Sequence, residues 1–313
     1  MGLYPQALTN YYCSHLSSGK FHLFLTTNEA HLYMLKETSS TADTHPIFSF
    51  ANGEMGPLSN RFIKSVEKVT GQPRIRKLYF DYIDDDLPAQ NFWADALDRL
   101  NIKVNLHIES HGNVTAAIPP TGRVLAIANH PFGVIDGLAL CAEMARVRQD
   151  YRIITHRVLR QAPAVMDKIL PIDFDETEAA LENNLKTRAD ARAHLQGGGA
   201  VIIFPAGAIS LAPNFVGHAI DTEWKTFAAK LAMMANTITV PFFFDGRNSV
   251  LYQMARRISV TLGYSLMFRE ICKMMGHSLT MHMRMPIQAE ELASFGSRQA
   301  VTEFLRNRTY GNI

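Results

Sequence analysis

The chain has 313 residues, 47% of them hydrophobic and 19% charged, so it is long enough to bury a large core without disulfide bonds. Its formal net charge of +2 gives no overall positive field, so we expect no nucleic-acid partner, and an anionic partner has to meet a local basic patch. The three cysteines are far apart, which excludes a disulfide framework or a cysteine zinc site and predicts a reducing compartment.

The first 57 residues carry no recognisable chemistry, and we expect them to be an N-terminal extension of unknown role. A strand is expected over Phe21–Thr27 and a strand or short helix over Ala30–Lys36. The chain has no basic segment followed by an apolar core at its start, and no apolar run of membrane-spanning length. We therefore expect a cytoplasmic protein, with peripheral binding to the inner face of the membrane left open.

Residues 58–71 are expected to form the first helix of the main domain, which we place at 58–313. Ser59 or Asn60 is the expected N-cap, and Gly71 followed by Pro73 is expected to end the helix. The three aspartates at 84–86 lack the spacing of a calcium loop, so we interpret them as a solvated loop.

Helical and strand patterns alternate from residue 91 to the C-terminus. This alternation predicts an α/β fold with a mainly parallel central sheet flanked by helices. The expected strands are Val104–Ile108, Val124–Ala128, Tyr151–Thr155, Ala200–Phe204, Thr237–Phe244 and Ser278–Arg284. The expected helices are Asn91–Leu100, Gly137–Arg146, Gln161–Leu170 entered through Pro163, Glu178–Gln196 closed by three glycines, Asp221–Ala235, Val250–Met275 with a break near Gly263, and Ser297–Asn307.

Three of these strands end in residues that are unusual for a simple turn. The ends read NHPFG at 129–133, FPAGAIS at 204–210 and PFFFDGRNS at 241–249. Ligands of open α/β sheets gather outside the carboxyl ends of the strands, and small residues let the backbone approach a ligand closely. We therefore expect the functional site where these three segments meet.

His130 and Asp136 are the residues of the first segment that point to acid–base chemistry. A neutral imidazole can accept a proton from a hydroxyl or amine as that group attacks a carbonyl, and a nearby carboxylate orients the ring. The alternative is structural: Asp136 caps a helix that begins at Gly137, and His130 is an ordinary polar residue at a strand end. The spacing alone leaves both interpretations open.

The three segments together resemble the motifs of the glycerolipid acyltransferase superfamily. That superfamily has an N-H-x4-D block, an F-P-E-G-T-R-S-like block and a later V-P block, in the order in which this chain has Asn129–Asp136, Phe204–Ser210 and Val240–Ser249. The five residues between His130 and Asp136 match the hemolysin-like and ornithine-lipid-type branch, rather than the commoner gap of four. The resemblance covers roughly residues 58–290.

The resemblance implies an acyl transfer from an acyl thioester, carried by coenzyme A or acyl carrier protein as co-substrate, to a hydroxyl or amine. His130 is then the general base and Asp136 orients it, with no acyl-enzyme. Backbone N–H groups at Gly207 and Gly133 are candidates for stabilising the oxyanion. No metal or bound cofactor is implied.

The second block departs from the superfamily pattern, because Ala206 and Ile209 replace its Glu and Arg. Apolar side chains cannot bind the acceptor phosphate with which those charged residues are associated. We therefore expect an amine or a lyso-lipid as acceptor, unless Arg157 or Arg247 supplies the charge. The remaining residues expected to bind substrate are Asn129, Phe132, Phe204, Pro205 and Ser210, and the spacing of Ser210 does not fit a nucleophile elbow.

Two further interpretations remain open. The segment Val250–Met275 combines apolar residues at helical spacing with arginines and a lysine, which suits either a core helix or one lying on an anionic membrane. The chain as a whole is expected to be an acyltransferase, and the alternative is a non-catalytic lipid- or partner-binding member of the same fold.

Overall fold

The computed structural model describes residues 48–51, 56–85, 92–109, 117–174 and 177–311. They belong to one compact unit that runs from Pro46 to Ile313, and the elements expected before residue 37 lie outside the described residues. The described elements are α2 (Pro57–Thr70), α3 (Gln72–Asp84), α4 (Phe92–Arg99), β1 (Lys103–Ile108), β2 (Arg123–Ala128), α6 (Val134–Ala145), β3 (Tyr151–His156), the 3-10 helices η2 (Arg157–Gln161) and η3 (Pro163–Lys168), β4 (Ile169–Ile172), α7 (Glu178–Gln196), β5 (Ala200–Ile203), α8 (Phe227–Ala232), β6 (Thr237–Asp245), α9 (Val250–Ile258), α10 (Val260–Ser265), α11 (Met267–Met274), β7 (Ser278–Met283), β8 (Ile287–Gln288), the 3-10 helix η4 (Ala289–Ser294) and α12 (Arg298–Tyr310).

The strands of the described ranges form one eight-stranded sheet in the order β1-β7-β6-β2-β5-β3-β4, with β8 beside β6. The central pairs β2–β5, β2–β6, β3–β5 and β3–β4 are parallel, which confirms the predicted α/β fold with a mainly parallel sheet. β7 and β8 run antiparallel to β6. The start of β7 lies beside the end of β6, with Thr280 opposite Asp245. The segment that carries helices α9–α11 therefore leaves and re-enters the sheet at the same end.

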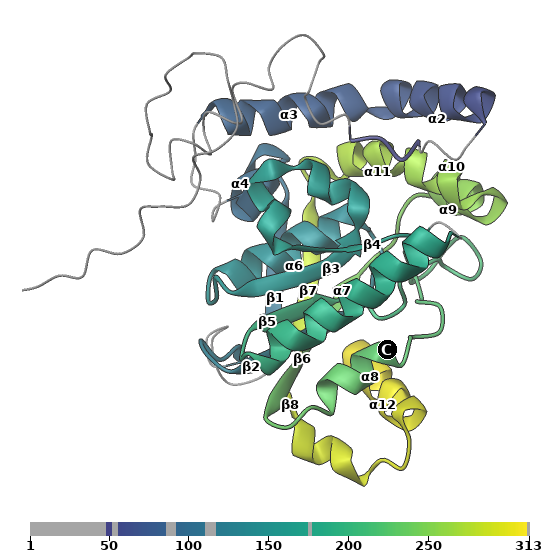
Figure 1. The fold of residues 1–313 in the computed structure, drawn as a ribbon. Helices are drawn as coiled ribbons and strands as arrows, with labels where there is room; N and C mark the ends of the chain where they lie inside the picture. The colour runs from purple at the N-terminus through teal and green to yellow at the C-terminus, as the bar shows by residue number, and fades with distance from the viewer. Residues whose placement is uncertain (1–47, 52–55, 86–91, 110–116, 175–176, 312–313) are drawn as a thin grey trace, which may run out of the picture. The chain divides into compact units, whose positions relative to one another are not determined.

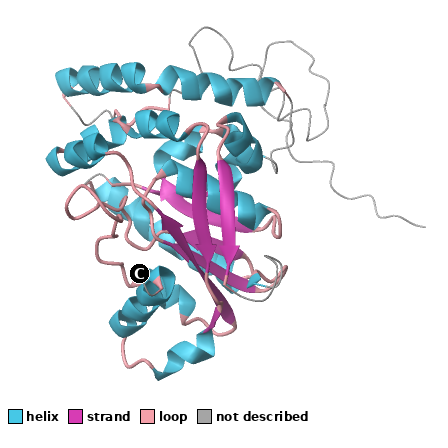
Figure 2. Cartoon of the chain, turned by 180° about the vertical axis from the view of Figure 1, so that it is seen from behind, coloured by secondary structure: helices cyan, strands magenta, loops and turns pink. Residues whose placement is uncertain are grey.

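The sheet is buried on both faces by helices, as Figure 2 shows for the magenta strands between cyan helices. Side chains alternate along a strand, so neighbouring residues enter different cores. Ala126 of β2 joins a cluster with Leu97 of α4 and Leu140 of α6, whereas Leu125 joins one with Leu195 of α7 and Leu305 of α12. This two-sided burial explains why β2 and β5 read as continuous apolar runs.

The N-terminal helices differ from the prediction in how they begin. Gly56 occupies the N-cap of α2 without a side-chain hydrogen bond, so the predicted cap at Ser59 or Asn60 is wrong. Gly71 ends α2 at a φ of 118°, but Pro73 then opens α3 instead of closing the first helix. Proline is well placed in a first helical turn, because its missing N–H has no partner there in any case. In Figure 1, α2 and α3 form the purple and blue helical pair.

Three other expected helices are also wrong in extent. The segment Gln161–Leu170 is a 3-10 helix that passes into β4, and Asp221–Ala235 is helical only over the short α8. The segment Val250–Met275 is divided into three helices at Ser259 and Leu266 rather than near Gly263. Hydrophobic periodicity does not show these breaks, because each piece keeps its apolar face.

Candidate active site

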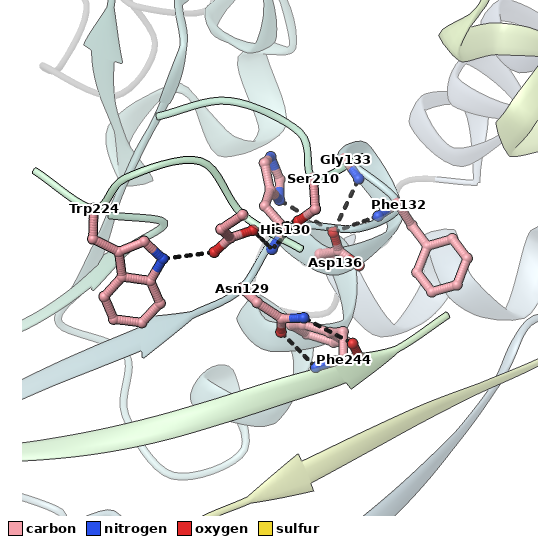
Figure 3. A network of polar contacts seen from close by, with 9 residues as sticks. Asn129, His130, Phe132, Gly133, Asp136, Ser210, Trp224 and Phe244 are labelled. Carbon is pink, nitrogen blue, oxygen red and sulfur yellow. Dashed lines mark hydrogen bonds and ion pairs between the residues drawn. The ribbon is translucent and has the colours of Figure 1, made fainter. Parts of the chain in front are cut away.

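His130 and Asp136 lie side by side where β2 gives way to α6. The imidazole Nδ1 of His130 is 3.1 Å from Oδ2 of Asp136 (Figure 3). The same oxygen accepts the backbone N–H groups of Phe132 and Gly133, at 2.8 and 2.9 Å. These bonds start α6 before the predicted Gly137, with Asp136 in its first turn. The same Asp136 carboxylate therefore binds the backbone at the start of α6 and contacts the His130 ring, so the two interpretations do not exclude each other.

The pair is buried on one side and open on the other. The Asp136 side chain is 0% exposed, whereas that of His130 is 19% exposed. Burial raises the pKa of Asp136, and the nearby His130 and the two backbone N–H groups partly oppose that rise. The carboxylate thus meets only protein groups and the ring, while the ring also reaches the cavity described below.

The turn between the two residues depends on glycine. Gly133 has a φ of 75°, and a Cβ there would lie 2.8 Å from Cδ1 of Ile209. Phe132 contributes its backbone N–H, but its ring packs over Gly246 and is not among the described residues that line the cavity. The substrate-binding role expected for Phe132 stays a prediction, which the position of its ring does not support.

Asn129 extends the sheet rather than facing a ligand. Its Nδ2 donates to the carbonyl of Phe244 at 2.9 Å, and its Oδ1 accepts the N–H of the same residue at 2.7 Å. The side chain is completely buried, so both of its hydrogen-bonding ends are used between β2 and β6. In the structure Asn129 thus joins β2 to β6 at the start of the His130 loop, and its expected contact with substrate stays a prediction.

Asp221 is a site residue that the sequence does not reveal. Its Oδ1 accepts the backbone N–H of His130 at 3.2 Å and the hydroxyl of Ser210, and its Oδ2 accepts Trp224 Nε1 at 2.7 Å. Burial raises its pKa against these lowering contacts. Ser210 therefore belongs to this network, which ties the second block to the His130 backbone. Asp221 belongs to no motif of the sequence, and the pattern around it predicts a helix rather than a contact with His130.

The second block forms a turn against the His130 ring. Phe204 stacks on that ring with 4.0 Å between centroids and 28° between planes. Ala206 and Ile209 are 4% and 7% exposed, so the residues that replace Glu and Arg are packed into the protein. Ser210 N–H donates to the His130 carbonyl at 2.8 Å and fixes the turn beside the ring.

The two glycines expected to donate to an oxyanion are already engaged. Gly133 N–H donates to Asp136, and Gly207 N–H donates to the Phe204 carbonyl at 3.0 Å. Within the described residues, the N–H groups of Ala208 and Ile209 make no hydrogen bond. The Ala206 N–H makes none either, so the donors available in this turn are those of Ala206, Ala208 and Ile209.

A cavity of about 560 Å³ opens around the His130 ring, a size typical of small-molecule sites. One part is apolar and lies among α3, α4 and α6, with Leu78, Ala96 and Leu138 in its lining. The cavity then passes the ends of β3, β4 and β5 and reaches Arg188 of α7. Pro205 and Gly207 of the second block also line it, and their binding of substrate stays a prediction. The cavity lining thus combines a largely apolar part, in which Arg99 is paired with Asp95, a part that includes Arg188, and the His130 ring.

The two arginines expected to supply missing charge lie elsewhere. Arg157 forms an ion pair with Asp173 at 3.1 Å, and Arg247 donates to the Gly217 carbonyl at 2.7 Å. Neither is among the described residues that line the cavity, so the structure does not bring them to the site. His156, the neighbour of Arg157, does line it, and burial lowers its pKa to about 4.

The described residues hold neither a membrane-spanning helix nor a cluster of metal ligands. None of their helices is both long enough and apolar enough to span a bilayer. No three of their His, Cys, Asp and Glu side chains are grouped to hold a metal ion.

Comparison with known proteins gives matches to acyltransferases. A protein family described as "Acyltransferase" matches residues 94–312. A lyso-glycine lipid O-acyltransferase of Phocaeicola vulgatus is 27% identical over 148 residues, 47% of this chain and 50% of that protein. One of Bacteroides thetaiotaomicron is 29% identical over 149 residues, 47% of this chain and 52% of that protein. The match spans about half the length of these relatives.

A solved structure was also matched, the 1-acyl-sn-glycerophosphate acyltransferase of Thermotoga maritima. It has a TM-score of 0.45 and 15% identity, and the match covers 71% of this chain and 76% of that one. The family match alone covers more than half of the sequence and includes His130, Asp136 and the second block. The chain therefore belongs to the acyltransferase family that its three ordered motifs resemble.

Proposed function

We propose that the protein transfers a fatty acyl group from a thioester to a hydroxyl of a lipid, with His130 as general base. The observation that carries this proposal is the contact of His130 Nδ1 with the buried Asp136 carboxylate, at the wall of a largely apolar cavity. The carboxylate holds a proton on Nδ1, which leaves Nε2 as the basic nitrogen. Both similar proteins are lyso-glycine lipid O-acyltransferases, which supports transfer to oxygen on a lyso-lipid.

The proposed reaction needs no covalent enzyme intermediate. Nε2 takes the acceptor's proton as the acceptor oxygen attacks the thioester carbon. The N–H groups of Ala208 and Ile209 stabilise the oxyanion that forms. The carbon–sulfur bond then breaks, the imidazolium returns its proton to the leaving thiolate, and Asp136 stabilises the charged ring until then. An ester and a free thiol are the products, and the donor's carrier is coenzyme A or acyl carrier protein.

The experiment is thioester turnover by the purified protein and by a His130→Ala variant. Acyl-CoA and acyl carrier protein donors are each combined with a panel of lyso-lipids, and the release of free thiol is followed. Loss of the general base should reduce turnover by roughly 10²–10⁴-fold. An unchanged rate in a folded variant would exclude His130 as the base. Binding of lyso-lipid vesicles without turnover on any donor would favour the non-catalytic lipid-binding alternative.

We also place the protein on an anionic membrane surface, through helices α2, α9 and α10. α10 packs against both α2 and α9, and it contributes Tyr264 to the cavity lining. Their only acid, Glu67, is buried and bound to Ser49 and Phe50, while their basic residues are Arg61, Lys64, Lys68, Arg256 and Arg257. Their exposed large apolar residues are Leu58, Phe62, Val69, Val250, Leu251, Met254, Ile258 and Val260.

Apolar side chains beside basic ones, without exposed acids, suit the boundary of an anionic bilayer. Flotation with anionic and neutral vesicles tests this placement. Phe62→Asp combined with Ile258→Asp should abolish binding to anionic vesicles. Leu181→Asp on α7 is the matched control, since Leu181 is 61% exposed and Phe62 58%. Equal loss of binding in the control would contradict the proposed surface.

A further inference from the structure

Two cations stand at the α7 end of the cavity. Arg188 projects from α7, and Lys225 lies in the segment before α8; both line the cavity. The backbone N–H of Lys225 donates to the Pro205 carbonyl at 3.0 Å, so this residue adjoins the turn of the second block. The Arg188 guanidinium lies 5.8 Å from the ring centre of Phe227, which lines the same end.

These two cations are not neutralised by the protein around them. Neither makes an ion pair within the described residues, and both are exposed. Arg99, at the opposite end of the cavity, differs because it pairs with both Asp95 and Asp85. Positive charge at the α7 end is therefore available to a ligand, while the charge at the α4 end is already balanced.

The turn beside these cations carries no charge of its own. Ala206 packs in the cluster with α7 and α8, and Ile209 packs in the cluster on the opposite face of the sheet. Neither side chain reaches outward, so any anion held near this turn has to be bound by groups from other elements. Arg188 and Lys225 are the cations that the fold brings to that place from separate parts of the chain.

We infer that Arg188 and Lys225 bind the anionic head group, a carboxylate or a phosphate, of the acceptor lipid. The inference rests on the proposed acyl transfer and specifies its acceptor. A lipid head group lies only a few bonds from the hydroxyl that His130 deprotonates. The phosphates of a thioester donor are separated from the reacting carbon by the whole pantetheine arm. Phe204 stacks on His130, and the backbone N–H of Lys225 donates to the carbonyl of the next residue, Pro205. This position near His130 suits the acceptor's head group better than the donor's distant phosphates.

The test compares one acceptor in two charge states. A short-chain lyso-lipid with a free carboxylate and its methyl ester are each assayed with wild type, Arg188→Gln, Lys225→Gln and the double variant. Charge-assisted hydrogen bonds are strong, so the double variant should raise the KM for the carboxylate by about 10–100-fold. The KM for the methyl ester and for the donor should stay the same. Arg192→Gln on α7 and Lys230→Gln on α8 are exposed controls outside the lining.

A binding measurement separates this inference from the proposed reaction. Calorimetric titration of the two lyso-lipids into the His130→Ala variant, with and without the two cation substitutions, needs no turnover. Preference for the carboxylate that disappears with the cations supports the anion site even where no donor is turned over. An equal loss for the methyl ester, or a raised KM for acyl-CoA with the acceptor KM unchanged, would overturn it.

Discussion

Asp136 and Asp221 are two buried carboxylates that approach His130 from different sides. Asp136 lies 3.1 Å from Nδ1 of the ring, whereas Asp221 accepts the backbone N–H at 3.2 Å. Burial raises the pKa of both. Burial and a perturbed pKa therefore do not tell an orienting carboxylate from a structural one. The difference lies in the atom that each one contacts, since only the ring changes its charge during proton transfer.

Their hydrogen bonding differs as well. Oδ1 of Asp221 accepts from Ser210 and His130, and its Oδ2 accepts from Trp224. Asp136 concentrates its contacts on Oδ2, and among the described residues its Oδ1 has no hydrogen-bond partner. We infer that Asp221 serves mainly stability, because it is saturated by fixed groups, and that Asp136 serves mainly the reactivity of His130.

Asp136→Asn should give the largest effect and act on turnover. The amide oxygen can still accept the N–H groups of Phe132 and Gly133, but an amide can also present a donor to Nδ1 and favour the wrong tautomer of His130. We expect kcat to fall by roughly 10²–10⁴-fold. The unfolding free energy should change little. A variant that loses stability and keeps its kcat would show that Asp136 is only a helix cap.

Asp221→Ala should show the opposite pattern. It leaves the Ser210 hydroxyl, the His130 N–H and the Trp224 N–H without their acceptor. Unsatisfied buried donors should lower the unfolding free energy by about 3 kcal/mol, as measured by urea denaturation. The kcat of the folded fraction should fall much less than in Asp136→Asn. Equal losses of kcat in the two variants would remove the distinction between the carboxylates.

The part of this site that the sequence could predict was local. His130, Asp136 and the Gly133 turn lie within seven consecutive residues, and both interpretations of the pair, acid–base chemistry and helix capping, follow from residue type and spacing. The parallel sheet was also predictable, because β2 and β5 are buried on both faces and flanked by helical periodicity. Such features depend on neighbours along the chain.

What the sequence could not predict depends on long-range contacts. Asp221 reaches His130 across 91 positions, and Asn129 reaches Phe244 across 115. Nothing in the local pattern distinguishes a carboxylate that begins a helix from one that anchors a distant backbone. The arginines show the same limit: Arg157 and Arg247 follow strands in the sequence but lie outside the cavity lining, whereas Arg188 and Lys225, which no strand end marks, are in it.

His156 extends the comparison of Asp136 and Asp221 to a histidine, whose pKa burial shifts in the opposite direction. Burial and the charge of Arg157 lower its pKa to about 4, against a raising effect of Asp173. The unfolded chain therefore binds more protons between pH 4 and 6.5, so stability should rise with pH in that window. We expect a gain of roughly 1.6 kcal/mol from pH 5 to 6.5.

The measurement compares urea unfolding of wild type and His156→Asn across that pH range. Asn keeps an acceptor for the Val158 N–H, which His156 Nδ1 now accepts at 3.1 Å, and it does not titrate. The difference between the two slopes isolates the imidazole from the carboxylates. Parallel slopes would mean that His156 is protonated equally in the folded and unfolded chain.

Ser210→Ala should give the smallest effect and sharpens the account of Asp221. The hydroxyl lies between Asp221 and the His130 N–H, but Asp221 also accepts that N–H directly. Removing one of several donors should lower the unfolding free energy by about 1 kcal/mol. The kcat should stay within a few-fold of wild type, because the ring and Asp136 are untouched. Abolished turnover, together with an acyl group found on wild-type Ser210 by mass spectrometry, would replace direct transfer by a serine nucleophile.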